Sequence, residues 1–88
     1  MNFTVIWTVA AQNQLAALWM ASADRSGVTA ASDRIDQQIR LNPLGAGESR
    51  DRLTRRILFD PPLCVLYVVD EPNRMIHVTS VGPSRRPR

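Results

Sequence analysis

Arginine side chains in the second half of the chain are the residues best suited to bind a charged ligand. All eleven cationic residues are arginines, and nine of them lie in residues 40–88, against five acidic residues. A guanidinium group binds two oxygens of a phosphate or carboxylate through its planar fork. The residues predicted to bind phosphate or an acidic partner are Arg50, Arg52, Arg55, Arg56, Arg85 and Arg86.

The chain has one histidine, His77, and one cysteine, Cys64, which limits the chemistry that it can perform. An imidazole exchanges protons near neutral pH, so His77 is a candidate acid or base. Alternation along its predicted strand puts His77 and Ile76 on opposite faces of the sheet. This favours a position for His77 on the sheet surface. A lone cysteine forms no internal disulfide, and one cysteine with one histidine is too few ligands for zinc. We therefore expect no metal, no other cofactor and a cytoplasmic protein.

The first half of the chain predicts one strand and two helices. Residues 2–8 alternate and are rich in β-branched and aromatic side chains, as in a strand. The period then changes, and Leu15, Leu18 and Trp19 share one face of a helix predicted over residues 10–23. A second helix, with Ser26 as a possible N-cap, is expected to run to about residue 41, before an Asn-Pro pair.

The second half predicts three strands joined by short turns. The strands cover residues 52–59, 63–69 and 74–81, and the turns are "DPP" and "DEPN". Two short turns between three strands indicate an antiparallel meander. The middle strand is apolar on both sides, so both of its faces need cover. No apolar run is long enough to cross a bilayer, so we expect no membrane contact.

Together these elements predict an α+β fold of order β-α-α-β-β-β. A helical hairpin would pack on one face of a small, mainly antiparallel sheet and leave the other face partly open. At 88 residues the chain is long enough for one domain. We place that domain at residues 1–82 and a basic tail at residues 83–88.

This order and length resemble the RelE/ParE superfamily of bacterial type II toxin–antitoxin toxins. The resemblance covers nearly the whole chain and is carried by "NPLGAGESR" and "RRILFDPPLCVLYVVDEPNRMIHVTSV". In that family the second helix ends at an Asn/Asp-Pro pair. A strand with basic residues and an apolar strand ending in "YxVD" follow. The resemblance implies a growth-inhibiting toxin that a cognate antitoxin neutralises.

Two activities occur on this scaffold, and the fold alone does not choose between them. RelE-like members are ribosome-dependent mRNA endoribonucleases that need no metal. For that activity the resemblance implies three catalytic residues. They are Arg56 on the second strand, Glu48 as a base by analogy, and His77 as a further candidate. ParE-like members act on DNA gyrase and are not nucleases.

The C-terminal residues depart from the ribonuclease pattern. RelE-like members usually end in a histidine or tyrosine, whereas this chain ends in "PSRRPR", and arginine is a poor acid or base at neutral pH. The departure favours ParE-like, gyrase-directed action. The alternatives are RelE-like cleavage of mRNA on the ribosome, or an inactive relative that only binds. For the antitoxin, we expect apolar anchors beside Leu15, Leu18 and Trp19 and acidic residues against the arginines.

Overall fold

A computed structural model describes residues 3–49 and 55–84. In chain order its elements are β1 (Thr4–Trp7), α1 (Val9–Ala21), α2 (Arg25–Leu41), α3 (Pro43–Ala46), β2 (Glu48–Ser49), β3 (Arg55–Asp60), β4 (Leu63–Asp70) and β5 (Met75–Pro83). The predicted α+β fold and the order of its main elements are confirmed. Strand β5 runs to Pro83, one residue past the predicted domain boundary.

The short elements α3 and β2 lie between the second helix and the second strand that the sequence predicts. Asn42 ends α2 and also caps α3, because its Oδ1 accepts a hydrogen bond of 3.2 Å from the amide of Gly45. Pro43 then occupies the first turn of α3, where a missing N–H has no cost. The Asn-Pro pair therefore ends one helix and starts the next.

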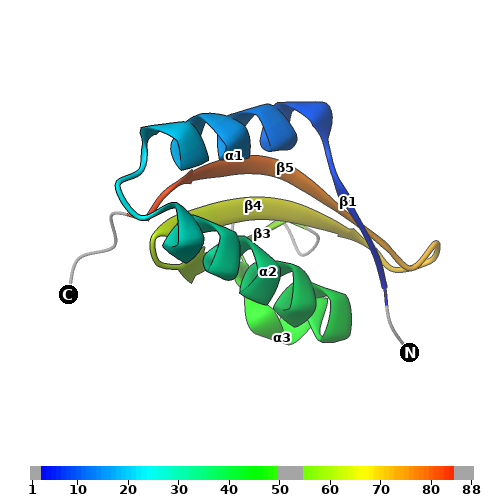
Figure 1. The fold of residues 1–88 in the computed structure, drawn as a ribbon. Coiled ribbons are helices and arrows are strands. Elements are labelled where there is room, and N and C mark those ends of the chain that lie inside the picture. The colour runs from blue at the N-terminus through cyan, green and yellow to red at the C-terminus, as the bar shows by residue number, and fades with distance from the viewer. Residues whose placement is uncertain (1–2, 50–54, 85–88) are drawn as a thin grey trace.

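The sheet has five strands in the order β1-β5-β4-β3-β2. Strand β1 pairs with β5 in parallel, and the other neighbours are antiparallel, so the sheet is mainly antiparallel as predicted. The first and last strands of the chain are thus neighbours. Figure 1 shows α1 and α2 on the same side of this sheet, with α1 along β5 and α2 over β4 and β3.

Both helices begin at capping side chains. The hydroxyl of Thr8 accepts from the amide of Ala11 at 3.2 Å, which starts α1. For α2 the predicted cap, Ser26, is wrong. Asp24 is the N-cap, since its Oδ1 accepts from the amide of Gly27 at 3.0 Å. A carboxylate at this position also interacts favourably with the helix dipole. Ser26 lies inside the first turn of α2.

The core lies between the helices and one face of the sheet. From α2 it takes an apolar stripe of residues three or four positions apart. Strand β4 alternates between buried and partly buried positions along its whole length. The buried core residues are Phe3, Ala11, Val28, Ala31, Ile35, Ile39, Leu58, Leu63, Val65, Tyr67, Val69, Ile76, Val78 and Val81.

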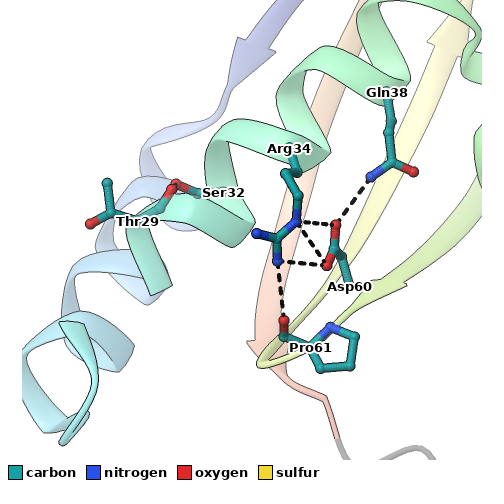
Figure 2. Close-up of polar contacts among 6 residues, drawn as sticks. All are labelled: Thr29, Ser32, Arg34, Gln38, Asp60 and Pro61. Atoms are coloured by element: carbon teal, nitrogen blue, oxygen red, sulfur yellow. Dashed lines mark hydrogen bonds and ion pairs between the residues drawn. The ribbon is translucent and has the colours of Figure 1, made fainter. Parts of the chain in front are cut away.

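A polar cluster joins the middle of α2 to the turn between β3 and β4 (Figure 2). Arg34 donates to both carboxylate oxygens of Asp60, with Nη2 2.9 Å from Oδ1, and the Gln38 amide donates to Asp60 Oδ2 at 3.1 Å. Hydrogen bonding to Asp60 raises the pKa of Arg34. These contacts join the middle of α2 to the end of β3.

Candidate functional site

Arg56 lies on the helix side of the sheet and is engaged by the backbone. It is directly opposite Tyr67 of β4 and Ser49 of β2. Its Nη2 donates a hydrogen bond of 2.6 Å to the carbonyl of Gly47. Its Nε is buried and has no hydrogen-bond partner within residues 3–49 and 55–84. The guanidinium therefore holds the segment between α3 and β2 against the sheet.

Tyr67 lies in the core beside Arg56, and its hydroxyl donates to the carbonyl of Pro43 at 2.6 Å. Burial raises the pKa of its phenol, while the nearby positive charge of Arg56 opposes that rise. A fully buried phenol in this position stabilises the fold and is closed to a substrate.

His77 and Arg55 lie on the side of the sheet away from the buried residues of β4. Neither helix covers that side (Figure 1). Both are directly opposite Val68, His77 from β5 and Arg55 from β3. Directly opposed residues point to the same face, so this face carries an imidazole and a guanidinium in one row. Their Cα atoms are about 10 Å apart, since neighbouring strands lie about 4.8 Å apart.

The sheet thus separates Arg56 from His77, two residues predicted to act together if the chain cuts RNA. They project from opposite faces of a packed sheet, so they cannot contact the same phosphate. Glu48 is directly opposite Ile57 in the short β2–β3 pair. Arg50, Arg52, Arg85 and Arg86 lie outside the described residues.

The face with His77 is the open face that the sequence analysis expected. It presents side chains that alternate with the core residues of β1, β3, β4 and β5, and most of them are partly buried. They include Ile6, Arg55, Ile57, Phe59, Cys64, Leu66, Val68, Met75 and His77. Within the part of the chain that the structure describes, no helix packs on this face.

A groove of about 740 Å³ lies between α1 and α2. It exists because α1 packs mainly on β5 and contacts α2 much less. The groove is lined by Trp7, Gln12, Leu15, Ala16, Trp19, Met20, Val28, Thr29, Ser32, Asp33 and Asp36. Of the three residues predicted to contact the antitoxin, Leu15 and Trp19 line the groove, while Leu18 packs against the core.

The groove includes residues that the sequence analysis passed over, chiefly Trp7, Met20 and the polar side of α2. One signal was available. Helix α1 has no charged residue in 13 positions, yet Ala11 is its only buried residue and Met20 is 68% exposed. An uncharged helix with so much exposed apolar surface is expected to be covered by something else.

This arrangement is suited to binding a macromolecule. Within residues 3–49 and 55–84, no three histidine, cysteine, aspartate or glutamate side chains gather closely enough to hold a metal ion. In the same residues, none of the helices has the length and apolar character needed to cross a membrane. Among the residues that the structure describes, two surfaces are open to a partner, the groove and the open sheet face.

No protein-family model matches the chain, and no curated protein matches its sequence. Solved structures match it over nearly its whole length. A chain of the toxin–antitoxin complex RelBE2 from Mycobacterium tuberculosis is similar with a TM-score of 0.76 and 19% identity, covering 96% of this chain and 100% of that chain. A mutant of the E. coli toxin RelE in the free state is similar with a TM-score of 0.70 and 14% identity. The match covers 97% of this chain and 86% of that chain.

A chain of the chromosomal ParDE system from P. aeruginosa is similar with a TM-score of 0.66 and 17% identity, covering 94% of this chain and 97% of that chain. The fold is therefore the RelE/ParE fold that the sequence predicted. Both branches of the superfamily are among the similar structures, so the fold does not distinguish their mechanisms.

Proposed function

We propose that this protein is the toxin of a type II toxin–antitoxin pair, inhibits growth, and is neutralised by a cognate antitoxin. The observation that carries the proposal is the shared fold. It extends over more than nine tenths of this chain and of the RelBE2 and ParDE chains. Both of those chains come from toxin–antitoxin systems, and the isolated toxin RelE has the same fold.

The uncovered apolar surfaces support an antitoxin partner. Trp19 is 40% exposed and Met20 68% exposed at the groove, and Ile6 is 37% exposed on the open sheet face. Neighbouring exposed apolar side chains of this size mark a surface that binds another protein. An antitoxin that neutralises this toxin would have both surfaces available for binding.

For the mode of action we propose the ParE-like one, directed at DNA gyrase and without RNA cleavage. Cleavage of RNA without a metal needs an acid, a base and cationic groups around one phosphate. The Arg56 guanidinium is bonded to Gly47 on the helix side, whereas His77 lies on the opposite face. This separation argues against a ribonuclease site built from that pair.

RelE-like cleavage of mRNA on the ribosome is the second candidate, and a specific observation favours it. Arg55 shares the open face with His77, both opposite Val68. A phosphate lying across that row could meet a cation and an imidazole together. In this alternative Arg55, rather than Arg56, is the strand residue that binds the phosphate.

Expression of the protein with and without the product of the neighbouring gene tests the toxin proposal. We expect growth arrest that the neighbouring product relieves. Normal growth with soluble, folded protein would refute the toxin role and leave a relative that only binds.

Purified protein then separates the two mechanisms. We expect it to inhibit supercoiling by gyrase and to leave mRNA intact on ribosomes stalled on a defined message. Cuts within the A-site codon, lost in Arg55→Ala or His77→Ala, would overturn the gyrase assignment in favour of RelE-like cleavage.

A further inference from the structure

Helix α1 has a second apolar side, which points away from the sheet. Its inner side packs on β5, where Ala11 is buried in the core and Leu15 and Leu18 pack against it. Positions three or four residues apart share one side of a helix. By this spacing, the side opposite the core carries four exposed residues that we call the outer stripe. They are Val9, Asn13, Ala16 and Met20.

The two ends of the outer stripe are strongly exposed. Val9 is 73% exposed and Met20 68%, more than any other large apolar side chain of residues 3–49 and 55–84. Among the described elements, Figure 1 shows β5 beneath α1 and none on its far side. A helix that is apolar on both sides is expected to be covered on both. The outer stripe therefore lacks its cover in a single copy of the chain.

The absence of charge distinguishes α1 from the other long helix. Its 13 positions hold no charged residue, whereas the exposed side of α2 carries both signs, as in Asp33 and Arg34. The chain as a whole carries +3, so two copies repel each other least where their uncharged helices meet. A face without charge offers a charged partner no ionic contact, but a second copy of the same face matches it.

We propose that two copies of this chain associate through the outer stripe, with their α1 helices antiparallel. A twofold axis at the middle of the stripe sets Val9 opposite Met20 of the second copy, and Asn13 opposite Ala16. The short side chain of Ala16 allows the helix axes to approach to about 8 Å. Antiparallel helices also bring opposite ends of their dipoles together, which is favourable. The inference does not depend on the toxin role.

The contact is small, so the dimer should be weak. Helix α1 has 13 residues and is about 20 Å long. Two such helices bury less than the about 800 Å² per partner of a typical stable interface. Ala16 and Met20 also line the groove, so a partner bound in the groove would compete with the second copy. We therefore expect the protein alone to show a concentration-dependent equilibrium between monomer and dimer.

Sedimentation velocity of the purified protein measures this equilibrium. The apparent mass should rise with concentration from 9.9 kDa toward twice that value. Val9→Glu alone and Met20→Lys alone should each weaken the dimer about tenfold, because each places a charge in the contact without a partner. The double variant should bring it back to within about threefold of the parent, since each new carboxylate would meet a new ammonium of the second copy.

Two controls separate this contact from general effects of charge and stickiness. The double variant keeps the parent net charge of +3, so the charge of the whole chain does not explain a rescue. Leu41→Lys is the matched single variant, because Leu41 is 63% exposed but belongs to the end of α2. It should leave the dimer unchanged. Circular dichroism checks that all four variants fold.

Three results would overturn the proposal. The first is a monomer at every concentration, which would leave the outer stripe to a different partner. The second is equal weakening by Leu41→Lys and Met20→Lys, which would mean association through any exposed apolar residue. The third is a double variant no better than the single ones, which would exclude the pairing of Val9 with Met20. None of these measurements uses growth arrest, so failure here leaves the toxin proposal standing.

Discussion

The indole of Trp7 donates a hydrogen bond of 3.0 Å to Oδ1 of Asp36, joining β1 to α2 across 29 residues of sequence. The same carboxylate accepts from Arg40, one turn further along α2, at 2.7 Å. Asp36 therefore connects the first strand to the second helix beside the groove. Asp33, less than one turn earlier, makes no such contact within the described residues.

Asp36→Ala should destabilise the protein by about 1–2 kcal/mol, because it leaves the partly buried Trp7 indole without its acceptor. Asp33→Ala is the matched control and should change the free energy of unfolding by less than about 0.5 kcal/mol. Urea denaturation followed by circular dichroism measures both. Equal stabilities of the two variants would show that the Trp7 contact contributes little.

Gly47→Ala should cost about 1–3 kcal/mol through overpacking. A Cβ on Gly47 would lie 2.5 Å from the Tyr67 hydroxyl oxygen and 2.8 Å from the backbone carbonyl oxygen of Ile57. Neither atom moves freely, since Tyr67 is buried and bonded to Pro43 and Ile57 belongs to β3.

Gly82→Ala provides the comparison, because a Cβ there meets no atom within 4 Å. Thermal unfolding of both variants should place Gly82→Ala at the parent midpoint and Gly47→Ala below it. An unchanged midpoint for Gly47→Ala would mean that the segment between α3 and β2 adjusts at no cost.

The fate of the two neighbouring arginines illustrates what the sequence could and could not predict. Alternation alone predicts that Arg55 and Arg56 face opposite sides. It does not say which of them meets the helices, because the residues in phase with each are both apolar. Burial of Leu58 decides it, placing Arg56 on the helix side. That outcome depends on packing across the sheet, which a single strand does not encode.

The end of β5 shows a second limit. Strict alternation from Ile76 and Val78 would direct Val81 to the open face. A bulge between β4 and β5 changes the register, so that Val78 is opposite Tyr67 and Ser80 opposite Leu66. Val81 returns to the core and is 5% exposed. Thr79 takes up the extra position, and no glycine marks it in the sequence.

The fold class was predictable because periodicity and turn residues act locally, whereas the groove required the helix positions. The stripe of α2 and the turns of the β3–β5 meander are visible in the sequence. How closely α1 approaches α2 depends instead on how each packs on the sheet. Leu15 and Trp19 were predicted to lie where the antitoxin binds, but Trp7 and Met20, which also line the groove, were not.

The alkaline titration of Tyr67 should have a midpoint above pH 10 in the folded protein, because burial raises its pKa. As it is the only tyrosine, the ultraviolet absorbance of phenolate reports on it alone. In urea the midpoint should return to about 10. Arg56→Gln should raise the folded midpoint further, since the positive charge of Arg56 lowers it. A folded midpoint equal to that in urea would contradict the buried position.

The same shift predicts how stability depends on pH. Below about pH 10 Tyr67 is neutral in both states, and its contribution is fully present. Above that pH the unfolded chain loses the proton first, so the free energy of unfolding should fall as pH rises toward the folded pKa. Tyr67→Phe should lack this portion of the fall. Urea denaturation between neutral and alkaline pH tests it, and identical pH profiles for parent and variant would refute the linkage.

His77→Ala should leave growth arrest intact if the protein acts on gyrase, because no step of that mechanism uses an imidazole acid or base. His77 is partly buried on the open sheet face, so the variant should fold, and circular dichroism checks this. Arg55→Ala, which changes the same row of that face, is the companion variant. Growth after induction of each is compared with the parent. If both folded variants lose growth arrest together, the row opposite Val68 is the active site, and the RelE-like mechanism replaces the gyrase-directed one.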